Sequence, residues 1–132
     1  MSIQTALRIR LPNRPGELVK VSKQLAQAGV NLETGAGVAS GDIGELEIMV
    51  NDIPTATRIL RDQGIQFREV QVALTWLTNK PGTAAQALSA LADAGINVES
   101  IYLVRTEGDR QLSALGTSDP QKADQILSKL TS

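Results

Sequence analysis

The sequence contains no cysteine and no histidine. The absence of cysteine excludes disulfides, thiolate nucleophiles and sulfur-ligated metals. The absence of histidine removes the commonest general base and a common metal ligand. Catalysis would then need paired carboxylates or a serine–lysine pair, and no such constellation stands out. We therefore expect a protein that is not an enzyme and that holds no cofactor and no metal ion.

Aromatic residues are scarce and charge is balanced, with 2% aromatic content and a formal net charge of −1. Without a long basic run, the release of counterions cannot drive binding to nucleic acid. RNA-binding sheets also need aromatic side chains on their central strands, on which the bases stack. We expect no nucleic-acid partner.

Long apolar runs are absent as well. No stretch approaches the roughly 20 apolar residues that a membrane-spanning helix needs, and no charged-then-apolar signal precedes the first expected strand. The hydrophobic fraction of 42% and the charged fraction of 20% are ordinary for a globular protein. The sequence predicts a soluble, cytoplasmic protein with no membrane association.

A pair of polar motifs occurs twice in the chain. Asn-x-Pro-Gly at residues 13–16 leads to Gly-x-Asn-x-Glu at 29–33, and the pair recurs at 79–82 and 95–99. Both motifs are shifted by 66 positions (79 minus 13, and 95 minus 29). An identical shift in both indicates an internal duplication rather than a coincidence of turn residues.

The duplication predicts two small domains, residues 1–70 and 71–132. In the first, apolar alternation indicates a strand over 3–11, and helical spacing indicates a helix after the first Asn-x-Pro-Gly. Two strands, a helix that Asp52 can cap, and a strand from about residue 65 follow. This β-α-β-β-α-β order predicts the ferredoxin-like fold of the α+β class, with both helices on one face of an antiparallel sheet.

The second copy repeats this order as far as its last helix, which follows Asp119 and Pro120. The chain then ends, so we expect this unit to lack its final strand. Residues 65–77 have an almost continuous strand pattern, which predicts no linker between the halves. Because each half alone would bury only a modest core, we expect the halves, or two chains in a homodimer, to share surface. The sequence leaves open whether the domains pair within one chain or across a dimer.

Apolar periodicity also predicts which side chains face inward. The first helix is expected to bury one face and to end at a left-handed Gly29. That face consists of Leu18, Val21, Leu25 and Ala28.

The two copies are expected to differ on the sheet face away from the helices. If Leu7, Ile9 and Leu11 face the helices, the opposite face of this strand carries Ala6, Arg8 and Arg10. The corresponding residues of the second copy are Val72, Leu74 and Trp76. Gly35 and Gly37, assigned to the same outer face, become Ile101 and Leu103. The second sheet is therefore predicted to carry an apolar interface, although a register shift of one residue would exchange the two faces.

The motifs resemble those of the ACT domain, a small-molecule-sensing module of enzymes and regulators of amino-acid metabolism. The resemblance rests on Asn-Arg-Pro-Gly-Glu-Leu at 13–18 and Gly-Val-Asn-Leu-Glu at 29–33, with copies at 79–84 and 95–99. It covers nearly the whole chain and implies a tandem ACT protein that binds an amino acid as an allosteric ligand.

The resemblance also implies where that ligand binds. In serine-sensing members, the ligand lies between two domains paired side by side. The loop before the first helix of one domain and the start of the second strand of the other hold it. The matching residues of this chain are Asn13, Arg14, Pro15, Gly16, Asn31, Asn79, Lys80, Pro81, Gly82 and Asn97. Those members carry a polar residue two positions before the loop asparagine, where this chain has Leu11 and Leu77. The difference favours a more apolar amino acid than serine, or a site that has decayed.

The chemistry of these residues suits a zwitterion independently of the resemblance. Backbone N–H groups at a helix N-terminus attract a carboxylate, and glycine lets a ligand approach the backbone. An asparagine amide offers both a donor and an acceptor. A purely structural alternative remains, because the loop asparagines can satisfy backbone groups at the helix start and the others can be turn residues. Glu33 and Glu99 either attract the ammonium group or lie in solvent.

A second function remains open on sequence alone. The protein could be an interaction module without a free ligand, such as a non-catalytic subunit that holds a metabolic enzyme through the outer sheet face.

Overall fold

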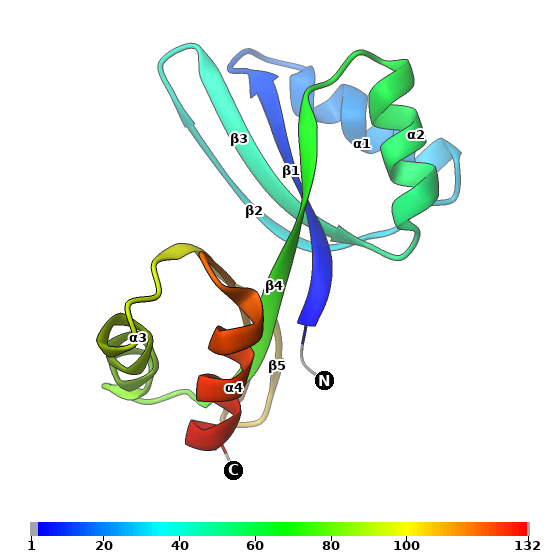
Figure 1. Ribbon diagram of the computed structural model, residues 1–132. Helices are drawn as coiled ribbons and strands as arrows, with labels where there is room; N and C mark the ends of the chain where they lie inside the picture. The colour runs from blue at the N-terminus through cyan, green and yellow to red at the C-terminus, as the bar shows by residue number, and fades with distance from the viewer. Residues whose placement is uncertain (1–2, 132) are drawn as a thin grey trace. The chain divides into compact units, whose positions relative to one another are not determined.

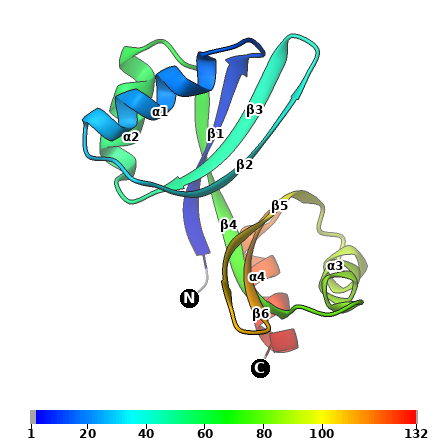
Figure 2. The same ribbon diagram turned by 180° about the vertical axis from the view of Figure 1, so that it is seen from behind.

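The computed structural model describes residues 3–131. In this range the chain forms six strands and four helices, which Figures 1 and 2 show from opposite sides. Residues 5–70 form one compact unit, and residues from 71 onward form another together with the start of the chain. We call them the first and the second unit. The boundary lies between Val70 and Gln71, and that the units are independent domains stays a prediction.

The first unit has the predicted ferredoxin-like order. In its sheet, β1 (Ile3–Pro12) lies between β3 (Ile43–Val50) and β4 (Phe67–Thr78), and β2 (Leu32–Ser40) lies beyond β3. The β1–β3 and β2–β3 pairs are antiparallel.

Two helices cover one face of this sheet (Figure 1). They are α1 (Glu17–Gln27) and α2 (Ile53–Asp62). The carboxylate of Asp52 caps α2, as predicted, by accepting a hydrogen bond from the backbone N–H of Thr55 at 3.1 Å. Beneath the helices a core forms from strand and helix residues: Leu7, Ile9, Leu11, Val21, Leu25, Val30, Ile48, Val50, Ala56 and Leu60.

The predicted inward face of α1 is correct only in its middle. Val21 and Leu25 are buried, whereas Leu18 is 51% exposed and Ala28 lies in solvent beyond the last helical residue. Gly29 has the predicted left-handed conformation, with φ of 76°. Helix α1 thus contacts the sheet over little more than one turn, and its first turn lies outside the core.

The second unit repeats the pattern with three strands. β4 pairs with β6 (Arg110–Thr117), and β6 pairs with β5 (Val98–Glu107), all antiparallel. The helices are α3 (Thr83–Asp93) and α4 (Pro120–Thr131). Within residues 3–131 no strand follows α4. The core of this unit consists of Ala73, Leu77, Ala87, Leu91, Ile96, Leu115, Ala123 and Leu127.

One uninterrupted strand connects the two units, as the sequence predicted. β4 is 12 residues long and extends from the first unit into the second without a turn.

On the sheet face away from the helices, the two copies differ as expected in their central strands. In the first unit, Arg8 lies opposite Glu47 and Arg10 opposite Glu45. The equivalent strand pairs of the second unit are Leu74 with Ala114 and Trp76 with Leu112. Two charged cross-strand pairs have therefore been replaced by two apolar pairs.

The prediction for the edge strands was wrong. Gly35 lies opposite Ile48 and Ile101 lies opposite Leu115, and both of these partners belong to the cores beneath the helices. Directly opposed residues share a sheet face. Gly35 and Ile101 therefore point to the helix side. Gly37 and Leu103, the other two residues assigned to the outer face, also point to the helix side. A register irregularity near the start of each edge strand reverses the alternation that the sequence suggested.

Candidate functional site

The loop before each first helix is tied to the hairpin beside it. The backbone N–H of Asn13 donates to the carbonyl of Asp42, and its side-chain Nδ2 donates to the carbonyl of Gly41, both at 2.8 Å. In the second unit the backbone N–H of Asn79 donates to the carbonyl of Asp109 at 2.6 Å. Asn13 therefore has a structural role, and its Oδ1 is left to accept a further hydrogen bond.

The glycines that precede α1 and α3 are required by their backbone conformation. Gly16 and Gly82 have φ values of 89° and 92°, which favour glycine. No side chain caps the N-terminus of either helix. The first helical N–H groups therefore remain available to an anion.

The cations of the two loops differ in their partners. Arg14 Nε donates to Glu17 Oε2 at 3.0 Å, and this hydrogen bond is the main cause that lowers the pKa of the Glu17 carboxyl. The counterpart of Glu17 in the second unit is Thr83, and within residues 3–131 Lys80 has no ion pair. Of the two loops, the loop of the second unit is therefore better suited to bind a carboxylate.

The backbones of the asparagines that precede β2 and β5 are fixed by hydrogen bonds. The N–H of Asn31 donates to Asn51 Oδ1 at 2.8 Å, and the N–H of Asn97 donates to Ser118 Oγ at 3.0 Å. The reciprocal N–H groups donate to the carbonyls of Asn31 and Asn97. In the described chain both asparagine side chains are exposed and form no hydrogen bond. Their amides are thus fixed in place and available to a ligand.

The predicted residues do not form a single site within one unit. Asn13 precedes α1, whereas Asn31 follows it, and the same holds for Asn79 and Asn97 around α3. Each helix has 11 residues, which corresponds to about 16 Å. A site that combines a loop with a strand-start asparagine therefore needs residues of two domains. All ten predicted residues are exposed, and their role in binding stays a prediction.

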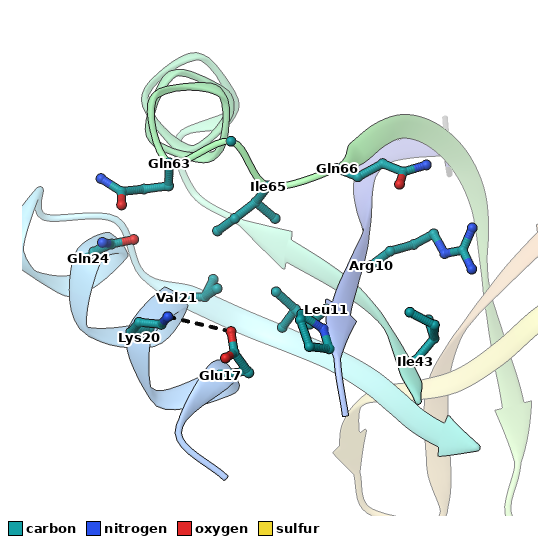
Figure 3. A pocket seen from close by; sticks show the side chains of 12 residues that line it. Arg10, Leu11, Glu17, Lys20, Val21, Gln24, Ile43, Gln63, Ile65 and Gln66 are labelled. Carbon is teal, nitrogen blue, oxygen red and sulfur yellow. Dashed lines mark ion pairs between the residues drawn. The ribbon is translucent and has the colours of Figure 1, made fainter. Parts of the chain in front are cut away.

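Sequence reasoning missed a cavity of about 550 Å³ in the first unit. It opens between α1, the end of β1 and the turn that joins α2 to β4 (Figure 3). Its lining residues are Arg10, Leu11, Pro12, Glu17, Lys20, Val21, Gln24, Ile43, Gln63, Gly64, Ile65 and Gln66. None of the ten predicted site residues is among them.

One sequence signal would have indicated this cavity. Glu17, Lys20 and Gln24 recur at the spacing of one helix face. The second copy has Thr83, Gln86 and Ala90 at the corresponding positions.

In residues 3–131 no group of three or more potential ligands could hold a metal ion. None of the helices in that range is long and apolar enough to cross a membrane.

Comparisons with known proteins identify the fold and the family. No curated protein matches the sequence. Among solved structures, protein BT0572 of Bacteroides thetaiotaomicron is similar with a TM-score of 0.85 and 25% identity, over 98% of this chain and 89% of that chain. The ligand-free regulatory subunit of aspartate kinase from Thermus thermophilus has a TM-score of 0.65 and 18% identity, over 98% and 96%. Residues 1–131 match the family described as an ACT domain pair. The chain therefore belongs to the ACT domain pair family.

Proposed function

We propose that this protein is a non-catalytic regulatory protein that binds a free amino acid where two ACT domains meet. Its support is the pair of exposed side chains of Asn31 and Asn97, which form no hydrogen bond although their backbones are fixed. Both asparagines directly precede a strand, β2 or β5, and an unused amide at an ordered position is best explained by a ligand.

The amino acid is held by complementary groups of the two domains. The uncapped N-terminus of α3 and the ammonium of Lys80 take the carboxylate, since both are positive and neither is neutralised by a side chain. The amide of Asn97 from a second domain accepts from the ligand ammonium. Leu77, the last residue but one of β4, stands where serine-sensing members carry a polar residue, so we expect a ligand more apolar than serine.

Binding of this kind changes assembly. A ligand that contacts two domains binds their paired state and stabilises it by mass action. We expect the protein to be a homodimer that transmits this change to a metabolic enzyme. The regulatory subunit of Thermus thermophilus aspartate kinase has a similar fold, and at 18% identity the likeness concerns the fold alone.

A thermal-shift screen against the twenty amino acids, followed by titration calorimetry, tests this function. One related group of amino acids should raise the melting temperature by several degrees. Replacing both Asn31 and Asn97 by alanine should abolish that rise and leave the melting temperature without ligand nearly unchanged. A double variant that responds like the wild type would refute the site assignment.

Asn51→Ala tests whether the fixed backbone of Asn31 matters for binding. Its Oδ1 accepts the N–H of Asn31, so its loss should lower the melting temperature without ligand and also weaken the ligand response.

The apolar strand pairs of the second unit favour one alternative. Leu74 with Ala114 and Trp76 with Leu112 replace charged pairs of the first unit, and such a replacement is typical of a contact surface. A non-catalytic subunit would engage an enzyme or a second copy there without a free ligand. A flat response to all twenty amino acids would favour this alternative. Leu74→Glu combined with Trp76→Ala should then dissociate the assembly, and an unchanged mass in light scattering would exclude that interface.

A further inference from the structure

We infer, on the basis of the proposed function, that only the loop of the second unit binds the carboxylate of the amino acid. In the first unit the carboxylate of Glu17, a residue of the chain itself, already pairs with the groups that a ligand would need. Each chain then binds one amino acid, although it carries two copies of the loop. The residue that decides between the copies is the first residue of each helix, Glu17 in α1 and Thr83 in α3.

The two loops have the same backbone, so their difference lies in their side chains. The glycines that precede α1 and α3 have φ values of 89° and 92°. The backbone N–H of Arg14 donates to the carbonyl of Pro12 at 3.0 Å. In the second unit the N–H of Lys80 donates to the carbonyl of Thr78 at 2.9 Å. The loops therefore offer a ligand the same main-chain frame.

In the first loop one carboxylate takes up both cations. Arg14 Nε donates to Glu17 Oε2 at 3.0 Å, and Lys20 Nζ lies 3.6 Å from Glu17 Oε1 (Figure 3). The Glu17 side chain is 15% exposed, whereas the side chains of Arg14 and Lys20 are 66% and 68% exposed. The hydrogen bond from Arg14 lowers the pKa of Glu17, so this carboxylate is charged at neutral pH.

A ligand carboxylate would have to compete with Glu17. Glu17 is tethered three residues from Arg14, and a short tether gives an effective concentration on the order of millimolar or higher. The negative charge of Glu17 at the start of α1 also interacts favourably with the helix dipole. A second carboxylate placed beside it would be repelled. A free amino acid below that concentration therefore does not displace Glu17.

The second loop lacks this internal carboxylate. Thr83 and Gln86 stand where the first unit has Glu17 and Lys20, and α3 has no acidic residue in its first turn. Among the described residues, 3–131, Lys80 has no ion pair and the buried Oγ1 of Thr83 has no hydrogen-bond partner. A carboxylate supplies the charge that Lys80 lacks, and charge-assisted hydrogen bonds of this kind are the strong ones.

A titration of the ¹⁵N-labelled full chain with sodium acetate, followed by heteronuclear NMR, tests this difference. Sodium chloride at the same ionic strength is the reference. Acetate should shift the backbone amide signals of Gly82 and Thr83 in a saturable way, and should leave those of Gly16 and Glu17 in place.

Exchanging the deciding residues should exchange the behaviour of the loops. Helix α3 has the same 11 residues as α1 without a counterpart of Glu17, so the fold tolerates the change, and the spectrum of each variant shows that it is folded. Glu17→Thr should make the Gly16 amide respond to acetate as the Gly82 amide does. Thr83→Glu should remove the response of Gly82. Glu69→Thr is the matched control, because Glu69 is an exposed glutamate of the first unit outside the loop, and it should keep the pattern of the wild type.

Three results would overturn the inference: equal acetate shifts at Gly16 and Gly82 in the wild type, no shift at Gly82, or the same pattern in Glu17→Thr and Glu69→Thr. The thermal-shift screen decides the proposed function separately. A flat screen with the expected acetate pattern would refute the function and uphold the difference between the loops. A rise in melting temperature with an amino acid, together with equal acetate shifts at both loops, would refute the difference and uphold the function.

Discussion

Thr75 places a hydroxyl group in the core of the second unit without a partner. The residue is 4% exposed, and within residues 3–131 its Oγ1 has no hydrogen bond. The corresponding residue of the first unit, 66 positions earlier, is Ile9, which is 1% exposed and apolar. The duplication therefore shows that this core position accommodates an aliphatic side chain. We predict that Thr75→Val stabilises the protein.

The size of the effect follows from two contributions. A buried hydroxyl without a hydrogen bond costs about 1–3 kcal/mol in measured protein variants. The methyl group that replaces it adds about 0.8 kcal/mol of apolar burial. Valine and threonine are both β-branched and stiff, so strand propensity changes little. The free energy of unfolding should rise by roughly 2–4 kcal/mol, which corresponds to a rise in melting temperature on the order of 6–13 °C for a chain of this size.

Urea denaturation and calorimetry of the wild type and of Thr75→Val measure this change. Thr78→Val is the matched control, since Thr78 belongs to the same strand and is exposed. It makes the same chemical change outside the core and should alter the free energy of unfolding by less than about 0.5 kcal/mol.

The opposite result would refute the reasoning. Ser113 lies directly across the sheet from Thr75, so a trapped water or a rotated Ser113 hydroxyl could bind Oγ1. Thr75→Val would then break a buried hydrogen bond and lose about 1 kcal/mol or more.

Hydrogen bonds from the hydroxyl and the backbone N–H of Thr55 lower the pKa of Asp52. The stability that they contribute is present above the pKa of the unfolded chain and is lost as pH falls through the lower folded pKa. Asp52→Asn should therefore flatten the acid side of the stability curve, measured by denaturation at about pH 2–5, and an unchanged slope would contradict the cap. A Cβ on Gly35 would lie 2.5 Å from the carbonyl oxygen of Glu47, so Gly35→Ala should destabilise the first unit by about 1–3 kcal/mol. At Gly37 the nearest atom to the Cβ would be the movable end of the Leu46 side chain at 3.1 Å, with the carbonyl oxygen of Glu45 at 3.4 Å, so Gly37→Ala should cost clearly less in the same melting experiment.

The repeated motif and the simple periodicities were enough to predict most of the fold. The asparagine–proline–glycine loops mark the helix starts because a left-handed glycine must precede each helix, as at Gly16 and Gly82. The assignment of Leu18 to the core failed because α1 begins only at Glu17 and its first turn lies beyond the sheet. The assignment of Ile101 to the outer face failed because an irregularity near the start of β5 reverses the alternation. Period-2 reasoning cannot detect one extra residue.

Residues of the candidate sites could be predicted from the sequence only where they lie in one continuous stretch of the chain. Asn31 and Asn97 lie in a local motif, so sequence reasoning could single them out, and their role in binding stays a prediction. The cavity of the first unit lies where a strand end, one helix and a turn meet, so only the folded chain assembles it. Its single local signal, the polar face of Glu17, Lys20 and Gln24, also fits an ordinary solvated helix.

The continuous β4 has a consequence for the newly made chain. Its second half, Gln71–Thr78, is apolar on both faces, and its strand partner β6 ends 39 residues later (117 minus 78). At roughly 5–20 residues per second, the ribosome needs about 2–8 s to supply that partner. During this interval the first unit can already be folded, and it would carry an unpaired strand that exposes Leu74 and Trp76. Slow translation through residues 79–117 would therefore prolong the exposure of an unpaired, aggregation-prone strand edge. We expect aggregation of the newly made chain to begin while this segment is being synthesised.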